Sequence, residues 1–82
     1  MNISSVIVFA RPDAGEAVRE RLHALEGVEV HASTPDGRHV VTMEANDTGA
    51  ATRTFEAIEH TEDVLSVALV YQRTETDPEK EI

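Results

Sequence analysis

The sequence predicts an α+β domain whose elements follow the order β-α-β-β-α-β. Three observations predict it: an N-terminal apolar run, two alternating runs joined by Asp-Gly, and two stretches with the apolar spacing of helices. A last apolar run, residues 64–71, completes the series. This is the order of the ferredoxin-like fold, a four-stranded antiparallel sheet with both helices on one face. Right-handed crossovers place the first and third strands at its centre.

The first strand, residues 3–10, is apolar on both faces, which is typical of a central strand. Val6 and Val8 point to one face, and Ile7 and Phe9 point to the other together with Ser5. We expect Val6 and Val8 to pack against the helices, because the opposite choice would bury Ser5 and the bulky Phe9 there. Ile7 and Phe9 then lie on a face that the two helices leave uncovered.

Two stretches have the spacing of amphipathic helices. The first begins at Asp13, a candidate N-cap with Glu16 three residues later, and ends before Gly27. Its apolar stripe is Ala14, Val18, Leu22 and Leu25. The second begins after a cap within residues 46–48 and frays beyond residue 60. Its apolar stripe is Ala51, Phe55 and Ile58.

Asp36-Gly37 between alternating runs predicts a hairpin with a two-residue loop. This loop fixes the register of the two strands. The predicted pairs are Ala32 with Val41, Val30 with Met43, Val28 with Ala45, Ser33 with Val40, His31 with Thr42, and Glu29 with Glu44. Like charges that face each other across a strand pair are destabilising, so the last pair is unusual.

The last strand, residues 64–71, is almost continuously apolar, and the face that meets the helices stays open because a bulge would reverse it. Residues 74–82 are polar and charged, which predicts a disordered acidic tail. We therefore expect one domain over residues 1–73.

Composition excludes several classes of function. The 82 residues carry a formal charge of −9, which disfavours a nucleic-acid partner. The absence of cysteine excludes disulfides and thiolate metal sites. No stretch is long and apolar enough for membrane insertion, and no secretory signal is visible. We expect a soluble, intracellular protein that has no cofactor and is not an enzyme.

The uncovered face of the sheet is the candidate interaction site. Its predicted residues are Ser5, Ile7, Phe9, Glu29, His31, Val40, Thr42 and Glu44. A contiguous apolar patch of this kind marks an interaction surface, although two copies stacked sheet on sheet would also cover it. The two glutamates either protect an edge strand or receive a guanidinium group in fork geometry. A His31-Glu29-Glu44 metal site is disfavoured, since a flat face supplies no supporting shell.

The sequence resembles the NapD family of cytoplasmic chaperones, which mature the periplasmic nitrate reductase. The similar segments span residues 3 to about 75: Ile3-Ser4-Ser5-Val6-Ile7-Val8, Gly27-Val28-Glu29-Val30, Asp36-Gly37-Arg38, Val40-Val41-Thr42-Met43-Glu44-Ala45 and Val64-Leu65-Ser66-Val67-Ala68-Leu69-Val70-Tyr71. The chain departs from the family at Gln72, where histidine is expected, and at Glu62-Asp63, where glycine often precedes the last strand.

The resemblance implies a ferredoxin-like chaperone, a monomer or weak homodimer, whose partner is a twin-arginine signal peptide. The peptide would be that of the nitrate reductase catalytic subunit, held back from export until its cofactor is inserted. Such a peptide has a cationic start and an apolar core, which suits carboxylates beside an apolar patch. The alternative is a dimeric module that binds a small molecule between stacked sheets.

Overall fold

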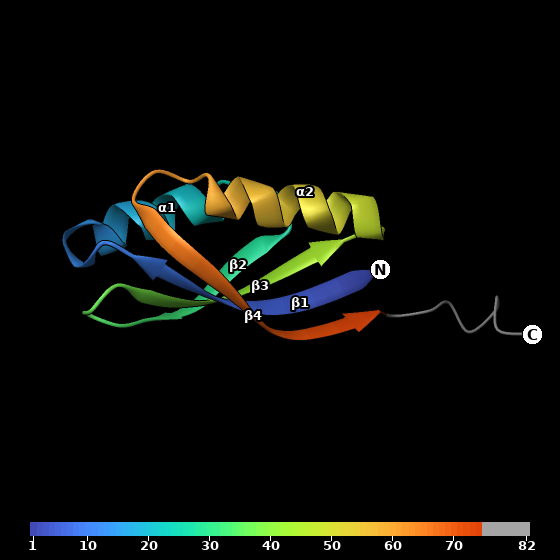
Figure 1. Ribbon diagram of the computed structural model, residues 1–82, viewed down its shortest axis with the longest axis horizontal. Coiled ribbons are helices and arrows are strands. Elements are labelled where there is room, and N and C mark those ends of the chain that lie inside the picture. The colour runs from blue at the N-terminus through green and yellow to red at the C-terminus, as the bar shows by residue number, and fades with distance from the viewer. Residues whose placement is uncertain (75–82) are drawn as a thin grey trace, which may run out of the picture.

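The computed structural model describes residues 1–74 and contains one four-stranded antiparallel sheet with the order β2-β3-β1-β4. Both helices lie on the same face of this sheet (Figure 1). The predicted fold and the central position of the first and third strands are confirmed. The elements are β1 (Asn2–Ala10), the 3₁₀ turn η1 (Pro12–Ala14), α1 (Gly15–His23), β2 (Val28–Ser33), β3 (Arg38–Ala45), α2 (Thr48–Glu59) and β4 (Val64–Thr74).

The core lies between the sheet and the two helices. Its fully buried residues include Val6, Val8 and Val41 from the central strands, and Val18, Leu22 and Ile58 from the helices. Burial alternates strictly along β1, with every even-numbered residue from Asn2 to Ala10 buried. Val6 and Val8 therefore face the helices as predicted, and Ile7 and Phe9 face away from them.

The two helices begin differently. Asp47, within the predicted range 46–48, caps α2, and its side chain accepts a hydrogen bond from the Ala50 N–H at 2.7 Å. The predicted cap of α1 is wrong: Asp13 lies inside the 3₁₀ turn, and Ala14 precedes α1 without a side-chain cap. Pro12 explains the difference, because its fixed φ starts the helical turn before Asp13.

The predicted hairpin register is also wrong. Thr34 pairs with Arg38 across a three-residue loop, with backbone bonds from Thr34 N–H to the Arg38 carbonyl at 2.8 Å and from Gly37 N–H to the Thr34 carbonyl at 3.1 Å. Pro35 suits the first position of such a turn, and Gly37 takes the left-handed conformation that ends it, with φ of 93°. A register shift at His31 then displaces β2 by one further residue. As a result, Glu29 faces Thr42 and not Glu44.

Two register shifts in β4 decide which of its residues face the helices. Val67 and Leu69 pair with Val8 and Val6 on the helix side. Beyond the shift between residues 69 and 71, Tyr71 pairs with Ser5 on the other face. β4 continues to Thr74, which we expected in the tail, and the rest of the predicted tail lies outside the described residues.

The turn before β4 holds a strained residue at the place where the sequence departs from the family. Asp63 has a φ of 70°, a conformation that favours glycine. Its carboxylate accepts a hydrogen bond from Arg21 at 3.1 Å, and Arg21 also donates to the Glu62 carbonyl at 3.0 Å. Arg21 on α1 therefore stabilises a turn that glycine would form without strain.

Candidate peptide-binding face

The open face is the side of the sheet that the helices leave uncovered (Figure 1). Strand pairing orders its residues in rows that cross the sheet from β2 to β4. From the end near the N-terminus, the rows are Glu44-Ile3-Arg73, then Glu29-Thr42-Ser5-Tyr71, then Val40-Ile7-Ala68, then Arg38-Phe9-Ser66. The face therefore has an acidic end and an apolar middle.

All eight predicted residues lie on this face or at its edge. Ser5, Ile7 and Phe9 are half-buried by their neighbours, and Val40 is 40% exposed. His31 lies at the register shift of β2 and shares a hydrogen bond of 2.6 Å between its Nε2 and the Thr42 Oγ1. The structure thus brings together the set that the sequence assigned, although the pairing between β2 and β3 differs.

The eight predicted residues leave out four apolar residues of the open face: Ile3, Ala32, Ala68 and Tyr71. Ile3 adjoins Glu44 on β3, Ala68 adjoins Ile7, and Tyr71 adjoins Ser5. Tyr71 is 55% exposed, so it offers a large amphipathic surface. Ile3 was identifiable from the two-residue period of β1. The two residues of β4 were not, because two register shifts interrupt its alternation.

The two glutamates lie diagonally on the acidic end. Glu29 faces Thr42, whereas Glu44 lies one row further along and pairs with Ile3 on its other side. At Glu29, the observed register differs from the predicted one by two residues. Because side chains alternate between the faces, an even shift leaves both glutamates on the same face. Both line a hollow of about 310 Å³ together with His23 and Thr42. Within residues 1–74, the only ion pair that either glutamate forms is between Glu29 and His31, at 3.8 Å.

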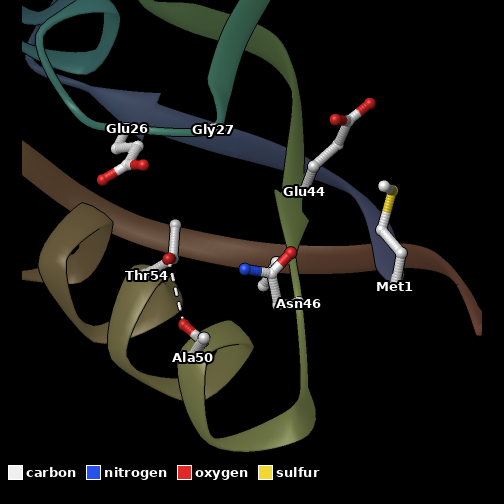
Figure 2. A pocket seen from close by; sticks show the side chains of 8 residues that line it. Met1, Glu26, Gly27, Glu44, Asn46, Ala50 and Thr54 are labelled. Carbon is white, nitrogen blue, oxygen red and sulfur yellow. Dashed lines mark hydrogen bonds between the residues drawn. The ribbon is translucent and has the colours of Figure 1, made fainter.

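A second hollow, also of about 310 Å³, lies on the other side of Gly27. Glu26, Glu44 and Thr54 contribute to its lining. Figure 2 shows the Glu26 carboxylate directed toward α2 and the Glu44 carboxylate directed away from it. Glu44 lines both hollows, so three carboxylates surround the start of β2. Sequence reasoning missed Glu26, which lies in the turn between α1 and β2.

Gly27 positions Glu44 between the two hollows. The Glu44 N–H donates to the Gly27 carbonyl at 2.8 Å, and Gly27 has a φ of 77°. A Cβ at this position would collide with the Glu44 carbonyl oxygen. The close approach of the two backbones therefore requires glycine.

The open face suits a cationic, apolar ligand. Carboxylates at one end can accept charge-assisted hydrogen bonds, and the apolar middle can bury an apolar segment. Within the described part of the chain, no cluster of three or more His, Asp or Glu side chains is placed to hold a metal ion. No helix among residues 1–74 is long and apolar enough to cross a membrane.

Comparison with known proteins agrees with this geometry. The family model described as NapD protein matches residues 1–76. The Chaperone NapD of Escherichia coli K12 is 33% identical over 79 residues, which cover 95% of this chain and 91% of that protein. The Chaperone NapD of Paracoccus pantotrophus is 33% identical over 81 residues, which cover 99% of this chain and 71% of that protein.

A solved structure gives the same result at the level of the fold. It is the solution structure of the E. coli Tat proofreading chaperone protein NapD, with a TM-score of 0.81 and 33% identity over 95% of this chain and 83% of that chain. The relatives are named as chaperones and not as enzymes. The family match, the identity over nearly the whole length and the shared fold together show that this chain belongs to the NapD family of chaperones.

Proposed function

We propose that this chaperone acts in the cytoplasm by binding the twin-arginine signal peptide of the periplasmic nitrate reductase catalytic subunit. Bound peptide is withheld from export until the cofactor of that subunit is inserted. The observation that carries the proposal is the open face, where carboxylates adjoin an apolar surface on the same side of one sheet. A signal peptide combines the complementary features, a cationic start followed by an apolar core.

The solved relative from E. coli supports the proposal, since that protein is a Tat proofreading chaperone. The charge of the chain supports it as well. With a formal charge of −9, the protein attracts a cationic peptide from solution and repels nucleic acid.

The free energies of binding indicate that the arginines of the peptide decide its affinity. A peptide that buries roughly 400 Å² of apolar surface gains about 10 kcal/mol at about 25 cal/mol per Å². Loss of its free motion and its ordering cost about 4–15 kcal/mol. Apolar contact alone is therefore close to neutral, and charge-assisted hydrogen bonds of about 1.5–3 kcal/mol each decide whether the complex forms.

Glu29 and Glu44 are the proposed acceptors of the arginines. They lie on the open face, and within residues 1–74 only His31 is near enough to pair with either of them. An arginine fork spans two carboxylate oxygens, whereas a lysine ammonium is a point charge. Glu26 borders the adjacent hollow and extends the same negative field.

Calorimetric titration of the protein with the synthetic signal peptide tests the proposal. We expect Glu29→Gln with Glu44→Gln to weaken binding at least tenfold, since two charge-assisted contacts together contribute about 3 kcal/mol or more. The matched control is Glu59→Gln with Glu56→Gln on exposed positions of α2, which should leave binding almost unchanged. A peptide with lysines in place of the arginines should bind less well. If the parent and the Glu29→Gln, Glu44→Gln variant bound the arginine peptide and the lysine peptide with equal affinity, the proposal would be contradicted.

A further inference from the structure

Charge is distributed unevenly along the open face. Glu29 and Glu44 lie at the end near the N-terminus, in rows that also hold Arg73, whereas Arg38 lies at the opposite end beside Phe9. The acid near Arg38 is already engaged: Asp36 accepts bonds from the Arg38 Nε at 3.2 Å and from its Nη2 at 2.9 Å. The two ends of the face therefore differ, because one offers carboxylates to a ligand, whereas at the other the carboxylate of Asp36 is already paired with Arg38.

Apolar residues fill the distance between these ends. From Ile3 to Phe9 the face extends about 20 Å, at about 3.3 Å per strand residue. The apolar core of a signal peptide has about 7–15 residues. About 13 residues in a helix, or about six in an extended chain, cover this distance. The arginines and much of the apolar core can therefore contact the same face at once.

We infer that the open face binds the signal peptide in a single direction, and that Arg38 helps to determine it. The inference rests on the proposed function. The arginines lie at Glu29 and Glu44, and the apolar core runs toward Phe9 and Ser66.

The reversed complex is disfavoured at both of its ends. It would place the arginines of the peptide beside Arg38 and Asp36, whose charges already offset each other, so the arginines would gain no free carboxylate there. It would also cover Glu29 and Glu44 with apolar residues, which removes their water without supplying a partner. Discrimination between the two directions thus comes from the carboxylates offered at one end and from the carboxylate that Arg38 occupies at the other.

The test uses two versions of one synthetic peptide, with two consecutive arginines followed by an apolar core. Each carries a nitroxide on a single cysteine, at the N-terminus or at the C-terminus. The protein has no cysteine, so the label stays on the peptide. Amide spectra of the ¹⁵N-labelled protein then report which residues lose intensity near each label.

We expect the N-terminal label to remove the amide signals of Glu29, Thr42 and Glu44. The C-terminal label should remove those of Phe9, Arg38 and Ser66. Exchange of these two sets, or loss of both sets with either label, would overturn the single direction while leaving peptide binding intact. Absence of binding with both peptides, checked by calorimetry, would instead overturn the proposed function.

Moving the negative charge to the other end tests the role of Arg38. Glu29→Gln and Glu44→Gln are combined with Arg38→Glu, all at exposed positions. We expect the two sets of affected amides to exchange, and an unchanged pattern would overturn the role of charge. If the triple variant does not fold, Arg38→Gln alone serves. With the N-terminal label, it should cause an additional partial loss of intensity at Phe9 and Ser66, and no such loss would count against Arg38.

Discussion

The two faces of the sheet share the same four strands but have opposite properties. On the helix side, Val6, Val8 and Val41 have no exposed surface. On the open face, their neighbours Ile7 and Phe9 are only half-buried, and Val40 is 40% exposed. One side of the sheet therefore supplies most of the packing that stabilises the domain. The other side keeps apolar surface available for a partner, at the expense of stability that a second layer would add.

The largest difference between the two faces is expected when a carboxylate is placed on each face of β1 in turn. We expect Val6→Asp to unfold the domain, because an unpaired buried charge costs about 5 kcal/mol or more, comparable to the stability of a small domain. Ile7→Asp, one residue away on the open face, should cost about 1 kcal/mol and leave the protein folded. Thermal melts followed by circular dichroism check both variants. Similar melting temperatures for the two would show that the faces are not distinct.

A smaller effect on stability is expected at Gly27, in the turn between α1 and β2. Gly27→Ala should cost about 1–3 kcal/mol, because alanine disfavours a positive φ and its Cβ meets the Glu44 carbonyl. Gly15→Ala is the matched control: a Cβ there contacts nothing, and its φ of −54° is helical. It should raise stability by about 0.5–1 kcal/mol. Urea unfolding of the two variants should therefore shift in opposite directions.

On the helix side, His39 should make stability depend on pH. It is 1% exposed, and its Nδ1 shares a hydrogen bond of 2.7 Å with Ser33, while within residues 1–74 its Nε2 has no partner. Burial, and then the nearby Arg19, lower the pKa of His39 below its ordinary value of 6.5. The unfolded chain therefore binds the proton first, and stability falls as the pH drops below 6.5 toward the folded pKa.

Melting temperatures between about pH 7.5 and pH 5.5 measure this dependence, since histidine titrates in that range. His39→Gln removes the titrating group and should flatten the decrease. His31→Gln on the open face is the control, because that ring is exposed. A slope that is the same in the parent and in the His39 variant would exclude His39 as its source.

The smallest effect on stability is expected from the acids of the open face. Glu29→Gln with Glu44→Gln should raise the free energy of unfolding by about 0.5 kcal/mol or less, because the two charges lie diagonally and not face to face. The same variant is expected to lose most of its affinity for the peptide. A clear loss of stability would show that these carboxylates support the fold, and the distinction between the two faces would then weaken.

The fold, its strand order, a cap of α2 within residues 46–48 and the two faces of β1 could all be predicted from the sequence. These features follow from local periodicity and from chain connectivity, which are present in the order of the residues. The eight residues of the candidate site were identifiable for the same reason. Alternation places a strand residue on one face or the other wherever no register shift interrupts the strand; in β2 the shift at His31 moves Ala32 to the open face beside Val40.

Features that depend on contacts between segments became visible only in the three-dimensional structure. The loop at Pro35 has three residues and not the expected two, and together with the register shift at His31 it moved Glu29 opposite Thr42. The shifts in β4 placed Ala68 and Tyr71 on the open face, and the turn at Gly27 brought Glu26 near Glu44. Each of these depends on a bulge or on a contact between distant segments. Such features result from small free-energy differences summed over the whole sheet. The periodicity of a single segment therefore does not predict them.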